Sequence, residues 1–209
     1  HMPEAVIVDT IRTPIGRAYK GAFNATPAPT LAAHAIRAAV ARAGIDPASI
    51  DDCIIGTAMP QGDQHTIGRT AALRAGLLVS VSGMTIDRQC ASGLMAIATA
   101  AKQVIVDRMD VVVAGGVESI SLVQTPRVRI GRDPELLAIA PDIYMPMLET
   151  AEVVARRYGI ARERQDIYAL RSQRLTEVAD MFVLHTLISH TLKHLARWSR
   201  PQKVSTPLY

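Results

Sequence analysis

The sequence predicts an α/β fold in which helices cover a largely parallel sheet. Short apolar runs typical of buried strands alternate along the chain with stretches whose apolar residues recur at helical spacing. The composition agrees: the 209 residues are 49% hydrophobic and 20% charged, which is typical of a soluble globular protein with a sizeable core.

The first predicted elements are a strand, a loop and an amphipathic helix. The apolar run from Ala5 to Val8 predicts a short buried strand, and the turn residues from Thr13 to Arg17 predict a loop after it. A helix is expected next, with Thr30 as its cap and Gly44 as its stop. Its apolar positions are Leu31, Ala35, Ile36, Ala39 and Val40.

A second strand and helix follow. The run Cys53 to Ile55 predicts a strand that Gly56 closes, and residues 68–75 are expected to be helical. Inside such an apolar strand a cysteine is most simply a buried small hydrophobic residue, and this is our interpretation of Cys53.

The central part of the sequence repeats the alternation. Thr85 to Asp87 leads into Cys90, and the residues beyond it predict a helix. One face of that helix carries Leu94, Ile97, Ala98, Ala101, Val104 and Ile105. The run from Asp110 to Ala114 then predicts a fully buried strand that stops at Gly115 and Gly116.

Periodicity is lost after Ser121. Residues 122–146 contain four prolines and are expected to form an irregular excursion. Helices are predicted from about Thr150 to Arg157 and from about Arg162 to Gln173.

Charge and cysteine content favour some classes of function over others. The net charge of +4 comes from scattered Lys and Arg, which argues against nucleic-acid binding, whereas a small polyanion such as coenzyme A suits a mildly basic surface. With two cysteines and no apolar leader at the start, we expect a cytoplasmic protein. No run of the length that a membrane span needs is evident, so no membrane partner is expected.

Cys90 stands out as a candidate nucleophile. The segment around it places a cysteine between a strand and the first turn of a helix, where free backbone N–H groups and the positive helix end stabilise a thiolate. The small residues Ala91, Ser92 and Gly93 allow a substrate carbonyl to approach backbone donors. This arrangement suits acyl transfer.

Two segments carry a resemblance to a known family. Residues 87–96, Asp-Arg-Gln-Cys-Ala-Ser-Gly-Leu-Met-Ala, resemble the active-site signature of thiolases, and residues 114–121, Ala-Gly-Gly-Val-Glu-Ser-Ile-Ser, resemble that family's second hallmark. Residues 9–17 and 150–173 agree as well. The resemblance therefore covers roughly residues 4–173, in family order.

The resemblance implies a fold and a division into domains. Thiolases have a layered αβαβα fold of two similar halves, with a loop domain inserted into the first. Residues 1–121 would be the N-terminal core half and residues 122–173 the start of the loop domain. Residues 174–209 do not resemble the family.

The resemblance also implies a reaction: acyl groups are exchanged between coenzyme A thioesters, by 3-ketoacyl-CoA thiolysis or acetyl-CoA condensation, through a thioester on Cys90. The substrates would be acyl-CoA and CoA, with no bound cofactor and no metal. Met147 falls where the family carries a pocket-lining methionine, and Asp87 stands where it usually has Asn. A homodimer or homotetramer is expected.

No segment of the sequence resembles the family's Gly-His-Pro loop or its Cys-x-Gly-Gly-Gly loop. We therefore expect the first half of a thiolase, inactive alone, with a tail that reflects an altered reading frame or an artificial terminus. His185, His190 and His194 in that tail are interpreted as surface residues, not metal ligands. Two alternatives stay open: a ketoacyl-synthase-like condensing enzyme, and a non-catalytic, thiolase-derived oligomerisation or binding module.

Overall fold

A computed structural model describes residues 4–128 and 131–173. The chain divides into two compact units, one up to Ile130 and one from Gly131 onward, and each is described by itself. The tail of residues 174–209, with its three histidines, lies outside the described residues.

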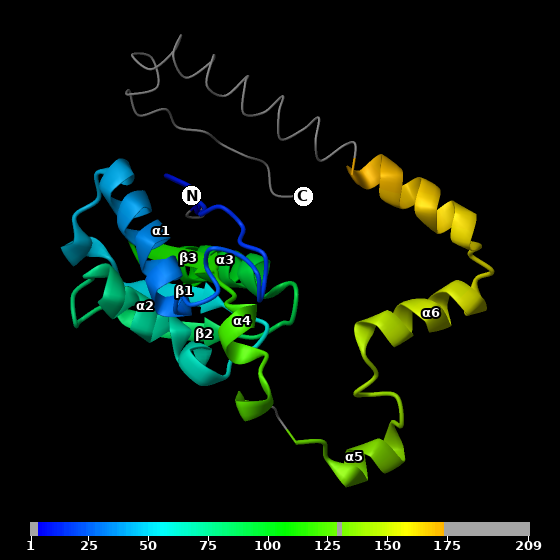
Figure 1. The fold of residues 1–209 in the computed structure, drawn as a ribbon. Helices are drawn as coiled ribbons and strands as arrows, with labels where there is room; N and C mark the ends of the chain where they lie inside the picture. The colour runs from blue at the N-terminus through cyan, green and yellow to red at the C-terminus, as the bar shows by residue number, and fades with distance from the viewer. Residues whose placement is uncertain (1–3, 129–130, 174–209) are drawn as a thin grey trace. The chain divides into compact units, whose positions relative to one another are not determined.

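The first unit is built on a parallel sheet of three short strands within the described residues (Figure 1). These are β1 (Asp52–Gly56), β2 (Ser82–Ile86) and β3 (Val112–Gly116), in the order β2-β1-β3. The register sets Gly56 opposite both Ile86 and Gly116, so the three strands end level with one another. The predicted parallel sheet is confirmed.

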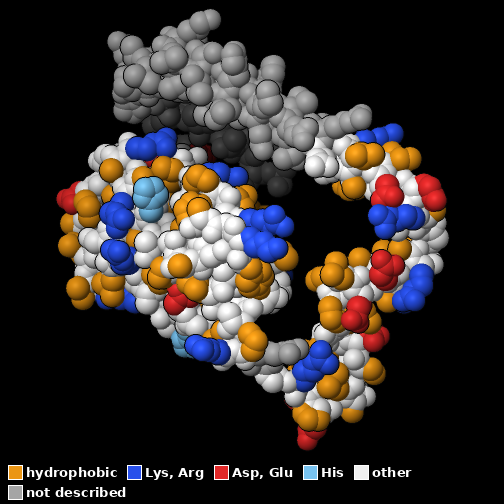
Figure 2. All heavy atoms as spheres, in the orientation of Figure 1, with side chains coloured by type: hydrophobic (Ala, Val, Ile, Leu, Met, Phe, Trp, Pro, Cys, Tyr) orange, Lys and Arg blue, Asp and Glu red, His pale blue; other side chains and the backbone are white. Residues whose placement is uncertain are grey.

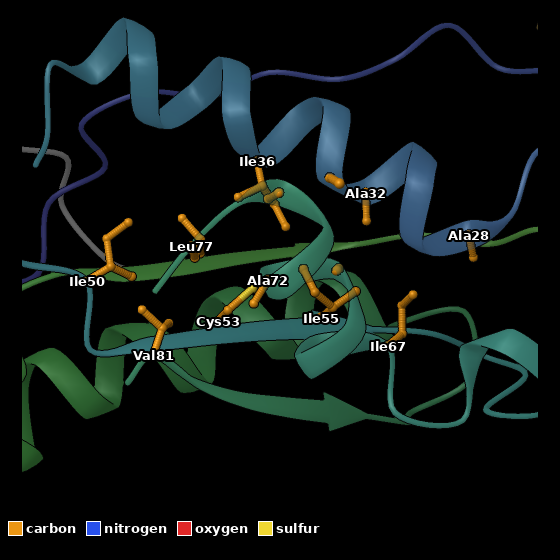
Figure 3. Packing of buried hydrophobic residues seen from close by; sticks show 13 residues of the cluster. Ala28, Ala32, Ile36, Ile50, Cys53, Ile55, Ile67, Ala72, Leu77 and Val81 are labelled. Atoms are coloured by element: carbon orange, nitrogen blue, oxygen red, sulfur yellow. The ribbon is translucent and has the colours of Figure 1, made fainter. Parts of the chain in front are cut away.

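Helices cover both faces of the sheet because successive side chains of β1 point to opposite sides. Cys53 and Ile55 are buried in a cluster with α1 (Ala28–Ala43) and α2 (Ile67–Ala75), as Figure 3 shows. Ile54 points the other way and packs against Ala96 and Ala100 of α3 (Ser92–Lys102). The result is an α/β/α arrangement of three layers. Cys53 is fully buried, as predicted.

The helix α1 begins three residues earlier than expected. Its N-cap is Pro27, not Thr30, and the backbone N–H of Ala28 donates to the Asp63 carboxylate 2.9 Å away. Asp63 belongs to a short 3₁₀ helix, η2 (Gly62–Gln64), so the cap comes from a distant segment that local sequence does not reveal. The predicted stop is correct: Gly44 ends the helix with a φ of 65°, which glycine adopts without strain.

The first predicted strand is not formed. Residues 4–16 have no regular structure, and Val6, Ile7 and Val8 are each more than 60% exposed. A strand needs a neighbour for its backbone hydrogen bonds, and no described residue pairs with this segment. The expectation of a fully buried third strand is also wrong, because β3 lies at an edge of the sheet and is only partly buried.

The helix after Cys90 packs on the sheet through small residues. Ala96, Ala100 and Gln103 are buried, whereas Leu94 on the opposite face is 73% exposed. A π-helical turn, η3 (Gln103–Asp107), extends α3. By length and composition Gln89–Asp107 could cross a membrane, contrary to the sequence expectation, but the core helix of a soluble protein meets the same criterion.

Short helices interrupt the stretch predicted to be irregular: α4 (Ile120–Val123), η4 (Pro126–Val128) and α5 (Pro134–Ile139). The second unit continues with α6 (Met147–Arg157) and a helix over residues 162–173, both of which were predicted. On the face of the first unit shown in Figure 2, Lys and Arg side chains are spread among apolar ones.

Candidate active site

The level ends of the strands and the start of α3 meet at one edge of the sheet. β1 ends at Gly56, β3 ends beside it at Gly116, and the turn that carries Cys90 leads into α3. A cavity of about 280 Å³ lies there, lined by residues of all three segments, Cys90 among them. Ligands of open α/β proteins bind at this end of the strands.

Three glycines allow these segments to touch backbone to backbone. A Cβ added at Gly56 would lie 2.3 Å from the carbonyl carbon and oxygen of Ser92, and one at Gly116 would lie 3.0 Å from the Cα of Gly93. Any side chain at Gly56 would therefore push the first turn of α3 away from the sheet. The glycines fix how closely the Cys90 turn approaches the strand ends.

The turn before Cys90 holds an unusual backbone conformation. Gln89 has a φ of 49°, in the left-handed region that residues other than glycine rarely adopt. The carboxylate of Asp87 supports it by accepting a hydrogen bond of 2.8 Å from the backbone N–H of Gln89. An asparagine, usual here in the family that the sequence resembles, offers an equivalent acceptor oxygen, so the substitution keeps this bond.

Ser92 joins the turn to the strand end. Its hydroxyl accepts from the backbone N–H of Arg88 at 2.8 Å and lies within donating distance of two carbonyl oxygens, 2.6 Å from that of Gln89 and 3.2 Å from that of Thr57. Thr57 directly follows β1. The turn around Cys90 is thus tied to the sheet by one buried side chain.

Cys90 itself is exposed and forms no disulfide. It lies two residues before the first residue of α3, close to the predicted position. Of the first helical N–H groups, those of Ser92 and Met95 donate to turn carbonyls, while those of Gly93 and Leu94 have no acceptor among the described residues. Free N–H groups at the start of a helix are donors that a substrate oxygen can use.

Cys53 provides a contrast within the same chain. Burial raises the pKa of its thiol to about 12, and the negative charge of Asp52 adds to the rise. It therefore stays protonated and inaccessible in the folded protein.

We expect iodoacetamide to alkylate Cys90 more than about tenfold faster than Cys53, because only Cys90 is exposed and reactive in the native state. Peptide mass spectrometry after brief labelling gives both rates. In denaturant the two cysteines should label alike, which controls for intrinsic differences. Preferential native labelling of Cys53 would contradict the assignment.

A polar network that sequence reasoning missed lies beneath the site. The carboxylate of Glu118 accepts hydrogen bonds from the hydroxyl of Thr57 at 2.8 Å and the backbone N–H of Ala58 at 2.7 Å. The side-chain amide of Gln64 also donates to it, at 2.5 Å. Glu118 was seen only as part of the second hallmark, because its partners lie more than 50 residues away in sequence.

The other predicted site residue lies in the second unit. Met147 is the first residue of α6 and is 75% exposed. The two units are described separately, so its role as a pocket-lining residue stays a prediction. Over residues 4–128 and 131–173, no cluster of His, Cys, Asp or Glu has the composition of a metal site.

Comparisons with known proteins show what the chain is similar to. A sequence model described as the N-terminal domain of thiolase matches residues 5–181. A 3-ketoacyl-CoA thiolase of Bacillus subtilis is 41% identical over 82% of this chain and 44% of its own length. An acetyl-CoA acetyltransferase of Cupriavidus necator is 38% identical over 85% of this chain and 48% of its own.

A solved structure extends the likeness to the fold. The crystal structure of the Bacillus anthracis acetyl-CoA acetyltransferase superposes with a TM-score of 0.72 at 36% identity, over 87% of this chain and 49% of that one. The chain spans about half the length of the relatives it matches.

Proposed function

Because this chain belongs to the thiolase family, we propose that Cys90 is the nucleophile of an acyl-CoA acyltransferase. One observation carries the proposal. Cys90 is an exposed thiol just before α3, beside a cavity at the carboxyl ends of parallel strands, and glycines let the turn that carries it lie against those strand ends.

The chemistry proceeds in two acyl transfers. The thiolate of Cys90 attacks the carbonyl carbon of an acyl-CoA thioester, a new carbon–sulfur bond forms, and CoA leaves as its thiolate. In thiolysis of a 3-ketoacyl-CoA, the thiolate instead attacks the 3-keto carbon, the bond between C2 and C3 breaks, and the carbanion of acetyl-CoA leaves and takes up a proton. The acyl group then passes from Cys90 to its acceptor. One difficult carbon–carbon step becomes two easier ones.

Substrates, location and assembly follow as parts of the same proposal. Acyl-CoA and CoA are the expected substrates, supported by the names of the relatives. Two free cysteines support a reducing compartment such as the cytoplasm, although one relative is described as peroxisomal. Exposed apolar residues such as Leu94 and Met84 support a homodimer or homotetramer.

Acylation of Cys90 tests the proposal. Incubation with acetyl-CoA should add one acetyl group per chain, located on Cys90 by peptide mass spectrometry. Cys90→Ser should abolish the adduct, whereas Cys53→Ser should retain it. Because the chain spans under half of its curated relatives, a second candidate is a non-catalytic binding module. Cys90 that alkylates readily but never acylates would favour that module and overturn the enzymatic proposal.

A further inference from the structure

We propose that Glu118 is a positioning residue for Cys90, acting through Thr57 and Ser92. The inference rests on the proposed function, because it concerns the same nucleophile. It starts from the polar network beneath the cavity, in which a carboxylate on the loop after β3 binds the loop after β1.

The first step is that Glu118 holds the end of β1 in place. Its two carboxylate oxygens accept from three donors, two of which belong to Thr57 and Ala58 directly after β1. The third donor is the amide of Gln64 in η2, and the other end of that amide accepts from the backbone N–H of Ser119 at 2.6 Å. Gln64 is fully buried. The β1 loop, η2 and the β3 loop are thus joined by side-chain hydrogen bonds.

The second step leads from Thr57 to the nucleophile. The hydroxyl of Thr57 donates a hydrogen bond to Glu118, while the carbonyl oxygen of Thr57 lies 3.2 Å from the hydroxyl of Ser92. Ser92 in turn accepts from the N–H of Arg88, within the turn that carries Cys90. A movement of Thr57 is therefore transmitted to the Cys90 turn through one residue.

The third step is that the network lies in the wall of the cavity. Thr57, Ser92 and Glu118 line the same 280 Å³ cavity as Cys90. Glu118 has all three of its hydrogen bonds inside this network, which identifies it as a support and not as a free base. Buried polar groups joined in this way lose more than one bond when one member is replaced.

The test compares the labelling rate of Cys90 with that of Cys53. Because Cys53 is fully buried, its alkylation reports opening of the whole unit, while that of Cys90 reports the native site. Glu118→Gln keeps the shape but replaces an acceptor oxygen by a donor facing Gln64. It should slow alkylation of Cys90 by at least about fivefold and leave the Cys53 rate unchanged.

Rescue and control variants make the result specific. The conservative variant Glu118→Asp keeps a carboxylate at this position and should retain more of the Cys90 rate than Glu118→Gln. Glu135→Gln, at an exposed position of α5, should change neither rate. If Glu118→Gln does not fold, Thr57→Val provides a second test. It removes the hydroxyl that donates to Glu118 at nearly constant volume and should also slow the alkylation of Cys90.

Three outcomes overturn the proposal: an unchanged Cys90 rate, a change matched by an equal rise in Cys53 labelling, or a slower Cys90 rate in Glu118→Asp than in Glu118→Gln. The labelling experiment uses no acyl-CoA. A failure of this proposal can therefore be distinguished from a failure of the proposed function. If the wild-type chain fails to acylate while Glu118→Gln still slows alkylation of Cys90 and not of Cys53, the proposed acyl transfer is wrong and the positioning role stands.

Discussion

Replacement of Gly56 by alanine is expected to lower the free energy of unfolding by about 3 kcal/mol and to remove the fast alkylation of Cys90. The new Cβ would lie 2.3 Å from the backbone of Ser92, a distance that no contact between such atoms tolerates. Neither backbone segment can move without breaking hydrogen bonds, because Gly56 is paired with both neighbouring strands and Ser92 begins α3. Urea unfolding gives the first quantity and timed labelling the second.

Gly115 supplies the matched control for this prediction. It lies in the neighbouring strand β3, one residue before its end, and a Cβ there would meet no atom within 4 Å. Gly115→Ala should therefore change both quantities little. Equal effects of the two alanines would show that backbone contact at Gly56 does not set the position of the Cys90 turn.

The sequence predicts those elements whose partners lie close along the chain or whose pattern is unambiguous. The strand at Cys53 to Ile55 is correct because a short, wholly apolar run between a helix stop and a glycine fits a central strand, and β1 does have a neighbour on each side. The helix stop at Gly44 is correct for a local reason also, since a left-handed residue ends the helix.

The errors arise where distant residues decide the outcome. The run Ala5 to Val8 has the composition of a strand, but pairing requires another strand, and the sequence pattern contains no information on where that partner is. For α3, periodicity identifies an apolar face without saying which side meets the sheet. The close approach at Gly56 and Gly116 requires small residues there, so Ala96 and Ala100 face the strands and Leu94 faces outward.

The candidate site shows the same division. The position of Cys90 is predictable because a cysteine between a strand and a helix has a local sequence signature, and Cys90 does lie just before α3. The support from Glu118, Gln64 and Thr57 is not predictable, because each bond joins residues that only the folded sheet brings together. The available signal was the pair of glycines that ends β3, since a glycine in a strand can mark a close approach of another backbone segment.

The 209-residue chain alone is expected to show no steady-state thiolysis of acetoacetyl-CoA, even where Cys90 accepts one acyl group. Carbon–carbon chemistry needs a group that moves the substrate α-proton and an oxyanion site for the thioester oxygen. The lining of the Cys90 cavity includes no histidine and no second cysteine among the described residues, and Glu118 is engaged by three donors. Loss of both contributions corresponds to at least about four orders of magnitude in rate.

Consumption of CoA thiol in the presence of acetoacetyl-CoA measures this turnover, and Cys90→Ser supplies the background rate. A burst of one acyl group per chain without further consumption is the expected trace, because acylation requires only a thiolate and an accessible carbonyl. Sustained turnover that depends on Cys90 would instead mean that the chain holds a working base. His185, His190 and His194 would then be replaced one at a time by alanine, since histidine is the side chain that most often acts as a general base.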